Sequence, residues 1–283
     1  MSNTETKQFF NVAGRLKDLS TPLVMGIINA TPDSFFEGSR RQNGLELAKA
    51  AEQMLADGAD ILDIGGCSTR PGATLADEHE ERQRLQTALA AVRKACPDAI
   101  LSVDTFRPAL ARMAVEEYGA AIVNDISQGI PPDATDSTPE EEVPEMFRTV
   151  SRLQVAYVLT SVQKDMEATL LTFARQTRQL YAMGQKDIIL DPGFGFGKTL
   201  EENFAMLDNM EKLSVFGLPV LAGVSRKSMI TRLLGITADQ ALNGTTALNM
   251  AALMKGARIL RVHDVRQARE CVQLYNTLNR HSA

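Results

Sequence analysis

The sequence predicts an α/β fold and, within that class, a (β/α)₈ barrel. Short β-branched or apolar runs alternate with longer segments of helical periodicity, which is the pattern of βα units. Eight such runs occur in the 283 residues. Eight alternations in a chain of this length are typical of a barrel whose strands are each followed by a helix. A doubly wound open sheet is the structural alternative.

Each expected strand is a short apolar run that ends in polar residues. The eight runs cover 22–29, 60–66, 99–105, 120–126, 154–160, 187–191, 218–224 and 258–264. Helical periodicity lies between them, clearest in 45–58, 81–95, 107–119 and 165–184. Glycine suits the left-handed turn that closes a helix, and these helical segments are followed by a strand after Gly58, Gly119 and Gly184.

One stretch interrupts this alternation. Residues 129–146, GIPPDATDSTPEEEVPEM, are rich in Pro, Asp and Glu and contain few apolar side chains. This composition predicts a surface loop after the fourth strand, leading into a short helix, with acidic side chains that are simply solvated. No internal repeat or low-complexity tract accompanies it. We therefore expect residues 1–283 to form one barrel domain.

Composition narrows the functional classes. The chain is 44% apolar and 23% charged, enough for a sizeable core. A net charge of −5 and a pI near 5.4 argue against a nucleic-acid surface. No apolar run has the length of a membrane span, and the N-terminus lacks the apolar core of a signal peptide. The three cysteines, Cys67, Cys96 and Cys271, are scattered and predict neither a disulfide framework nor a zinc cluster, which suits a reducing cytoplasm. Together with the charge and the short apolar runs, they lead us to expect a cytoplasmic protein with no nucleic-acid or membrane partner.

The stretch DPGFGFGKT (191–199) superficially suggests a phosphate loop. A Walker loop needs glycine five residues before the Gly-Lys pair, and that position is Pro192. A dinucleotide fingerprint needs a third glycine where this chain has Lys198. The sequence therefore predicts neither nucleotide site, and Lys198 and Thr199 are expected to begin the following helix.

Unusual polar residues gather where the strands end. Chemistry in such barrels is hosted at the carboxyl ends of the strands, where the βα loops converge. The polar groups at these ends are 29–35, 65–72, Asp104, Asn124, Asp125, Asp191, 225–228 and 261–264. An aspartate that closes a strand is often a turn former or a helix cap, and we assign that role to Asp125 and Asp264.

The remaining groups fall into two chemical sets. Asp104, Asn124 and Asp191 can accept hydrogen bonds from a flat heterocycle with several N–H donors, and Lys227 adds a donor. Arg261 and His263 are two residues apart on a strand and face the same side; with Arg70 and Asn29 nearby they predict an anion site. On physical grounds alone, the sequence indicates a barrel enzyme for a heterocycle with a phosphorylated arm.

The motifs also resemble those of a known family. They are MGIINATPDSF (25–35), GGCSTRPGA (65–73), SVDT (102–105), VND (123–125), DPGFGFGKT (191–199), SRKS (225–228) and RVHDV (261–265). In the same order they resemble the motifs of dihydropteroate synthases, from about residue 22 to about residue 275. The resemblance implies a barrel enzyme of folate biosynthesis, a magnesium cofactor, a homodimer and a sulfonamide target. The implied reaction joins 4-aminobenzoate to 6-hydroxymethyl-7,8-dihydropterin diphosphate and releases pyrophosphate.

Matching positions carry the family's roles as expectations. The pterin would be held by Asp104, Asn124, Ile126, Asp191, Phe194 and Lys227. The diphosphate would be held by Asn29, Arg70, Arg261 and His263, with Asn29 also contacting Mg²⁺. The aminobenzoate would meet Phe35, Thr69, Pro71, Phe194 and Ser228, and the first two loops, including Asp33, would close over the site. The catalytic set is expected to be Asp104, Lys227, Arg261, His263 and Asp33.

The expected chemistry needs charge stabilised in two places. Loss of diphosphate leaves a cation that the pterin ring delocalises, so the departing negative charge and the developing positive charge must be stabilised apart. Arginine, histidine and a metal would stabilise the departing negative charge, and Asp104 would stabilise the developing positive charge. The aniline nitrogen is already nucleophilic, which agrees with the lack of an evident Ser-His or Cys-His arrangement.

The chain departs from the family pattern at the fifth strand and before STRPG. A Met-His-Met segment is usual after the fifth strand, where this chain has Leu159-Thr160-Ser161-Val162 and a shorter following segment; the usual glutamate before STRPG is Cys67. Two alternatives stay open. One is a pterin-binding methyltransferase domain that passes a methyl group from a folate to a corrinoid protein. The other is a non-catalytic paralogue that binds pterin without condensing it.

Overall fold

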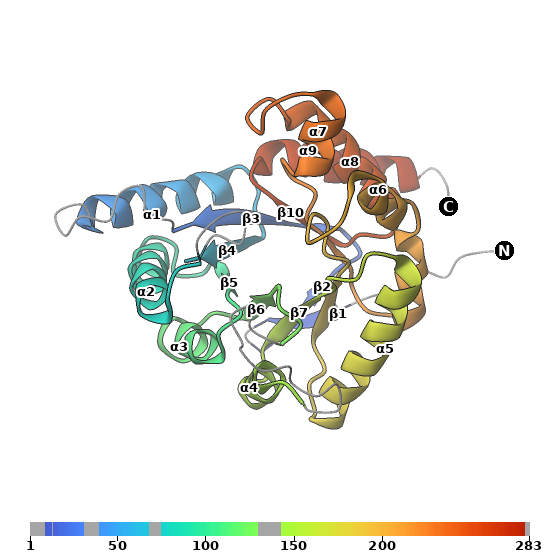
Figure 1. Ribbon diagram of the computed structural model, residues 1–283. Helices are drawn as coiled ribbons and strands as arrows, with labels where there is room; N and C mark the ends of the chain where they lie inside the picture. The colour runs from blue at the N-terminus through green and yellow to red at the C-terminus, as the bar shows by residue number, and fades with distance from the viewer. Residues whose placement is uncertain (1–8, 13, 31–39, 68–74, 130–142, 281–283) are drawn as a thin grey trace.

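The computed structural model describes residues 9–12, 14–30, 40–67, 75–129 and 143–280. An eight-stranded parallel sheet occupies its centre, ordered β8-β7-β6-β5-β4-β3-β10-β9 (Figure 1). A parallel bridge between Leu190 and Val220 joins the two ends of this order, so the sheet closes into a barrel. Its strands are β3 (Leu23–Asn29), β4 (Ile61–Gly65), β5 (Ile100–Asp104), β6 (Ile122–Asp125), β7 (Ala156–Thr160), β8 (Ile188–Asp191), β9 (Leu221–Ala222) and β10 (Ile259–Val262).

Helices alternate with these strands and form the outer ring (Figure 1). The alternation confirms the (β/α)₈ barrel. The expected helix after the acidic stretch is α4, and the four other expected helices appear within a few residues of their predicted bounds. The helices are α1 (Arg40–Ala56), α2 (Glu78–Ala95), α3 (Pro108–Tyr118), α4 (Glu145–Leu153), α5 (Met166–Ala182), α6 (Leu200–Asp208), the 3₁₀ helix η1 (Met210–Phe216), α7 (Ser228–Leu234), α8 (Leu242–Met254) and α9 (Val265–Arg280).

Local capping chemistry sets several helix ends. Asp77 accepts from the Glu80 N–H at the start of α2, and Asp165 accepts from the Ala168 N–H at the start of α5. Gly119 ends α3 in the left-handed conformation, as its position in the sequence predicts. These caps fix where each βα loop ends and therefore where the loop side chains can lie.

Two buried clusters follow from strand alternation. The larger lies between strands and helices and includes Leu62 and Ile64 of β4. The smaller fills the barrel and includes Met25 of β3 and Ile61 of β4. Because Asp63 has the same parity as Ile61, the only carboxylate within β4 faces the barrel interior.

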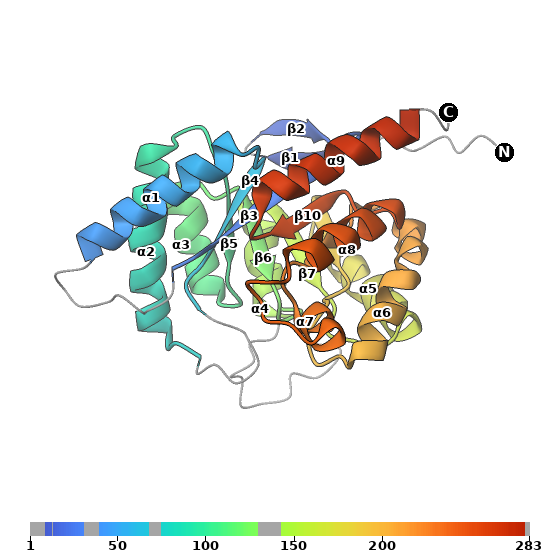
Figure 2. The same ribbon diagram turned by 90° about the horizontal axis from the view of Figure 1, so that it is seen from above.

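An N-terminal hairpin, which the sequence patterns did not predict, covers one end of the barrel (Figure 2). Strands β1 (Phe9–Val12) and β2 (Arg15–Asp18) pair antiparallel. Phe10, Val12 and Leu19 join the interior cluster, and burying each such side chain stabilises the fold by about 1.5–3 kcal/mol. The hairpin is fastened where the Asn11 N–H donates to Asp187 Oδ1 at 2.7 Å.

Each observed strand is shorter than the expected run, and two of the differences matter for the site. The predicted run 218–224 contains only the two-residue strand β9, and β6 ends at Asp125, so Ile126 lies just beyond it and is half-buried. No described helix combines the length and the apolar character needed to cross a membrane.

Candidate active site

The register of the sheet places four strand-end residues side by side. Asn29 pairs with Gly65, Gly65 with Asp104, and Asp104 with Asn124. These residues end β3, β4 and β5 and lie in β6, so the barrel itself aligns two predicted pterin ligands with the predicted diphosphate and magnesium ligand. Asn29 is exposed, whereas Asn124 is buried.

Arg261 ties this row to the last strand. Its Nε donates to Asp63 Oδ2 at 2.7 Å, and its Nη2 donates to Asp104 Oδ2 at 2.5 Å. Asn124 Nδ2 donates to the same Asp63 oxygen at 3.0 Å. The sequence predicts that Arg261 belongs to an anion site, whereas in the structure its guanidinium lies between two carboxylates.

Asp63 is a member of this cluster that the sequence patterns did not predict. It lies within β4 and is fully buried, and its Oδ1 has no hydrogen-bond partner within the described part of the chain. A buried carboxylate is costly unless it is paired, so Arg261 and Asn124 are needed to hold it. A signal for it does exist in the sequence, since an aspartate interrupts the apolar run ILDIGG on the inward parity.

Asp191 and Lys227 form the second part of the mouth. Asp191 ends β8, is buried, and accepts from the Gly193 N–H at 2.8 Å. Lys227 precedes α7; its Nζ donates to the Phe194 carbonyl and lies 4.5 Å from the centre of the Phe196 ring. The aromatic contact with Phe196 was not predicted.

Burial shifts the acid–base behaviour of the cluster. Burial raises the pKa of Asp104 to about 7, opposed by Arg261 and assisted by Asp63. Burial also raises the pKa of Asp191, which Lys227 opposes. For Lys227, burial lowers the pKa to about 8 although Asp191 favours the charged form. Ionisable groups of opposite charge with shifted pKa values, close together at the mouth of a barrel, are typical of an active site.

The DPGFGFGKT stretch has structural reasons for its residues. Gly193 has φ +70°, and a Cβ there would lie 1.8 Å from the Ser161 carbonyl oxygen, so the glycine permits close approach to the end of β7. Lys198 is buried and donates to the Gly193 carbonyl at 2.8 Å. Thr199 caps α6 in a capping box with Glu202, which confirms that Lys198 and Thr199 lead into a helix.

Strand ends β9 and β10 are held together around His263. Ser225 Oγ accepts from the His263 N–H at 3.2 Å and lies 3.0 Å from His263 Nδ1. Arg226 donates to Asp264 through Nε at 2.9 Å and Nη2 at 2.5 Å. The pair gives Asp264 a structural partner, in agreement with the role expected from its place at a strand end.

Asp125 is also structural. Its carboxylate accepts from the Ser127 N–H, the Gly129 N–H and the Tyr157 hydroxyl at 2.7–2.9 Å. These bonds shape the turn that carries Ile126, as expected for an aspartate that forms a turn.

The remaining predicted residues divide into two groups. The Phe194 ring is fully buried in the core, so only its carbonyl reaches Lys227, whereas Ser228 is exposed at the start of α7. The other five predicted site residues lie outside the described residues: Asp33, Phe35, Thr69, Arg70 and Pro71.

The residues fit the expected Mg²⁺ only as a site completed by a phosphorylated ligand. Within the described ranges, no three His, Cys, Asp or Glu side chains come together as a metal cluster. Mg²⁺ commonly keeps several waters and uses one or two protein oxygens together with substrate phosphates. Asn29 is an exposed residue at the mouth, and the oxygen of its side-chain amide suits that mode.

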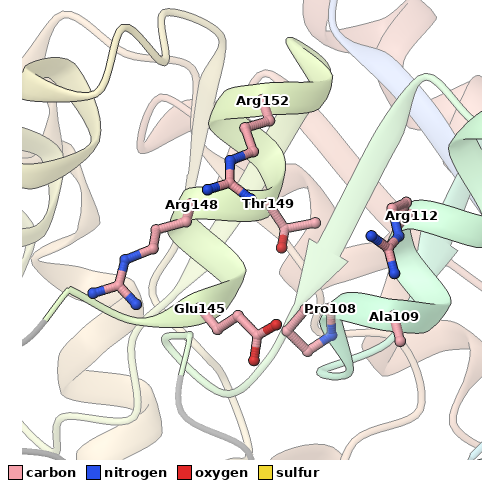
Figure 3. A pocket seen from close by; sticks show the side chains of 7 residues that line it. All are labelled: Pro108, Ala109, Arg112, Glu145, Arg148, Thr149 and Arg152. Carbon is pink, nitrogen blue, oxygen red and sulfur yellow. The ribbon is translucent and has the colours of Figure 1, made fainter.

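A pocket of about 310 Å³ lies elsewhere, between the start of α3 and one side of α4 (Figure 3). Helix residues line it, and its three arginines are exposed surface side chains. It contains none of the strand-end carboxylates. Chemistry in this fold belongs to strand ends, so we place the active site in the mouth of the barrel. The lining residues are Pro108, Ala109, Arg112, Glu145, Arg148, Thr149 and Arg152.

The chain is similar to known proteins over almost its whole length. The family model for pterin binding enzymes matches residues 25–263. Dihydropteroate synthase of Escherichia coli K12 is 36% identical over 265 residues, covering 92% of this chain and 93% of that protein. The Xanthomonas albilineans dihydropteroate synthase, solved with 4-aminobenzoic acid, has TM-score 0.84 and 33% identity over 97% of this chain and 99% of that one. The Yersinia pestis enzyme, solved as a sulfonamide drug complex, has TM-score 0.83 and 34% identity over 98% and 100%.

The chain therefore belongs to the pterin-binding enzymes. Within that class it belongs to the dihydropteroate synthase family, and it is an enzyme of folate biosynthesis.

Proposed function

We propose that the mouth of the barrel performs the dihydropteroate synthase reaction with the pterin held by Asp104, Asn124 and Asp191. These acceptors lie at the ends of β5, β6 and β8 and converge around Arg261 and Lys227. A dihydropterin presents ring and amino N–H groups, which match carboxylate and amide oxygens. Lys227 supplies the donor for the ring carbonyl, and Ile126 lies beside this set.

The carbon–oxygen bond to the diphosphate breaks first, and its electron pair leaves with the diphosphate. The resulting methylene cation is delocalised over the pterin ring, next to the Asp104 carboxylate. The aniline nitrogen of 4-aminobenzoate then forms the new carbon–nitrogen bond and loses a proton. A preorganised carboxylate close to the developing positive charge lowers the barrier without reorganising during the step.

The diphosphate is assigned to the other side of the mouth. Arg261 and His263 lie two residues apart at the end of β10, and Asn29 ends the neighbouring β3. Mg²⁺ bound by Asn29 would neutralise diphosphate oxygens. The single observation that carries the proposal is that Arg261 contacts Asp104 directly, which supports a site for departing negative charge beside a site for developing positive charge.

The aminobenzoate is assigned to the exposed rim. Ser228 at the start of α7 would hold its carboxylate, and the resemblance adds loop residues Phe35, Thr69 and Pro71. The Xanthomonas relative was solved with 4-aminobenzoic acid and the Yersinia relative as a sulfonamide drug complex, which supports 4-aminobenzoate as a substrate and a sulfonamide as a ligand of this chain. We further propose that the enzyme works as a cytoplasmic homodimer, which size-exclusion chromatography with light scattering would test.

Turnover tests the proposal directly. Purified protein is incubated with dihydropterin diphosphate, 4-aminobenzoate and Mg²⁺, and pyrophosphate and dihydropteroate are both measured. Equal amounts of the two products are expected. If the pterin diphosphate binds and neither product forms, the chain is instead a non-catalytic pterin-binding paralogue. Transfer of a methyl group from a methyl-folate to a corrinoid protein would favour the methyltransferase alternative.

A further inference from the structure

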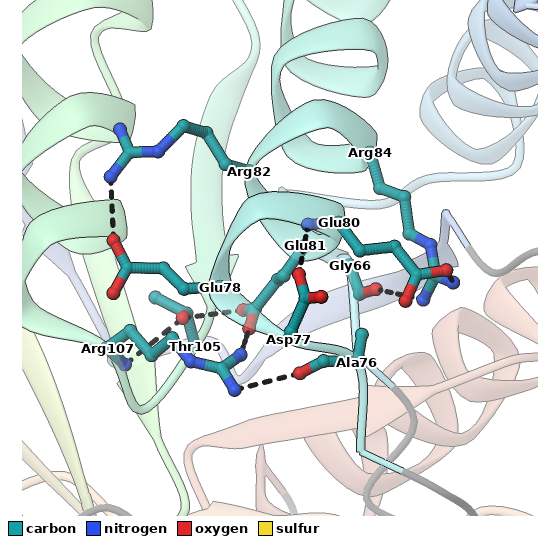
Figure 4. A network of polar contacts seen from close by, with 10 residues as sticks. All are labelled: Gly66, Ala76, Asp77, Glu78, Glu80, Glu81, Arg82, Arg84, Thr105 and Arg107. Atoms are coloured by element: carbon teal, nitrogen blue, oxygen red, sulfur yellow. Dashed lines mark hydrogen bonds and ion pairs between the residues drawn. The ribbon is translucent and has the colours of Figure 1, made fainter.

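A buried polar network lies beside the mouth but contains none of the residues assigned to substrate (Figure 4). Glu81 of α2 is fully buried, and Arg107, which precedes α3, is almost so. Arg107 Nη1 donates to Glu81 Oε2, and the Thr105 hydroxyl donates to Glu81 Oε1 at 2.7 Å. The network therefore joins α2 to the segment that follows β5.

The same network holds the Ala76 end of the connection between β4 and α2, and a second ion pair of α2, Arg84 with Glu80, holds the Gly66 end. Arg107 Nη2 donates to the Ala76 carbonyl at 2.8 Å, and Arg84 Nη1 donates to the Gly66 carbonyl at 3.0 Å (Figure 4). The backbone of Ala76 also acts on the Cys67 thiol, whose pKa it lowers against the effect of burial. Residues 68–74, between these anchors, include Thr69, Arg70 and Pro71 in the sequence.

On its other side the network supports Asp104. Thr105 follows Asp104 directly, its N–H donates to the Asn124 carbonyl at 3.1 Å, and its hydroxyl also accepts from the Arg107 N–H at 3.2 Å. One ion pair thus touches the base of the loop and the residue that follows the proposed catalytic carboxylate.

The buried Glu81–Arg107 ion pair is stable only while both partners are present. Burial raises the pKa of Glu81, and the Thr105 hydroxyl and Arg107 favour its charged form. If the guanidinium is removed, a buried carboxylate loses its neutralising partner, which is costly, so the carboxylate must take up a proton or move. Loss of the guanidinium also removes the donor to the Ala76 carbonyl, and either response of Glu81 disturbs Thr105.

We propose that Glu81 and Arg107 are positioning residues for the condensation with 4-aminobenzoate, because together they fix Ala76, which leads into α2, and Thr105, which follows Asp104. The inference rests on the proposed function. It assigns the pair no contact with substrate. Its effect passes through the backbone carbonyl of Ala76 and the hydroxyl of Thr105.

The test compares Arg107→Met, Arg107→Lys and Glu81→Gln with a matched control, Arg93→Met. Arg93 also ties elements together through backbone carbonyls, donating to Tyr118 at 3.0 Å and to Ala99 at 2.9 Å, but it lies at the opposite end of α2 and β5. Each variant is assayed for kcat, for the aminobenzoate KM, and for binding of 6-hydroxymethyl-7,8-dihydropterin without diphosphate.

We expect Arg107→Met to raise the aminobenzoate KM and to lower kcat/KM by about tenfold to a hundredfold, the cost of misplacing reacting groups. Pterin binding should persist, because the pterin ligands are on other residues. Arg107→Lys should restore most of the loss, and Glu81→Gln should fall between the two. The decrease in kcat/KM of Arg107→Met relative to the unaltered chain should become larger as pH rises, because Glu81 then loses the proton that neutralises it in this variant. Arg93→Met should leave KM and kcat unchanged.

Two results overturn the inference. One is an equal kinetic loss in Arg93→Met and Arg107→Met, which would make the effect one of general stability. The other is a normal KM and kcat in Arg107→Met. If Arg107→Met does not fold, a normal KM and kcat in both Arg107→Lys and Glu81→Gln overturns the inference instead. Failure of the proposed function is distinguishable, because it would appear as an absence of turnover in the unaltered chain.

Discussion

Arg261 and Asp104 form an ion pair, with 2.5 Å between Nη2 and Oδ2, and Arg261 also donates to Asp63 at 2.7 Å. One guanidinium thus compensates two inward-facing carboxylates from neighbouring strands. The arrangement lets Asp104 sit in a desolvated mouth with a pKa of about 7, close to the pH at which it must be ionised to stabilise a cation.

The pH dependence of kcat/KM should therefore be bell-shaped. Asp104 must be deprotonated to face the cation, so the rate should rise with pH through about 7. Lys227 must keep its proton to donate to the pterin, so the rate should fall above about 8. Initial rates at subsaturating dihydropterin diphosphate between pH 5 and pH 10, roughly the range that spans both groups, provide the profile. A flat profile would contradict these roles.

Asp63→Asn should move the acid limb to lower pH. Asp63 raises the pKa of Asp104 by charge repulsion, and asparagine removes that charge while keeping an oxygen that can accept from Arg261 Nε. The same pH series on the variant measures the shift. Glu52→Gln, which alters an exposed carboxylate of α1, serves as the control and should leave the limb in place. If the midpoint of the acid limb in Asp63→Asn stays at the same pH or moves to higher pH, the two carboxylates do not interact as described.

Gly193→Ala should destabilise the barrel more than Gly197→Ala. Both glycines have positive φ, but a Cβ at residue 193 meets the Ser161 carbonyl oxygen at 1.8 Å, whereas none of the described atoms lies within 4 Å of a Cβ at residue 197. We expect a loss of about 1 kcal/mol for Gly197→Ala from the left-handed conformation alone. For Gly193→Ala we expect about 3 kcal/mol, because a neighbouring backbone must also move. Urea unfolding measures both, and equal losses would refute the close approach.

Turnover should require Mg²⁺ and should depend on Asn29. A chelator is expected to stop product formation, and added Mg²⁺ to restore it. Asn29→Ala should raise the Mg²⁺ concentration for half-maximal rate by about tenfold, since it removes the protein oxygen assigned to the metal. Asn209→Ala, which alters an asparagine at the end of α6, should not. Full activity in the presence of chelator would show that turnover does not require Mg²⁺.

The sequence predicted the barrel and much of the mouth because both follow local rules. Apolar runs and helical periodicity located all eight strands, and the polar residues that end them include Asp104, Asn124 and Asp191, which the structure brings to one end. Glycine and capping chemistry located the helix ends. Motif order, rather than physical reasoning alone, supplied the reaction.

The parts that were missed depend on contacts between distant segments. Asp63 lies inside a strand, and its partner Arg261 is 198 residues away, so local pattern alone does not show the pairing. The hairpin β1–β2 is too short to show as a pattern and is stabilised by packing Phe10 against the barrel interior. The contact between Lys227 and Phe196 joins two loops whose relative position only the closed sheet determines.

The most direct test of the account compares Asp104→Asn with the unaltered chain for turnover and pterin binding. Asparagine keeps the size and a hydrogen-bond acceptor but cannot offset a cation. We predict that kcat falls by about a hundredfold or more while dihydropterin still binds, the loss expected when a preorganised electrostatic group is removed. A near-normal kcat in Asp104→Asn would contradict the central claim that this carboxylate stabilises the pterin cation.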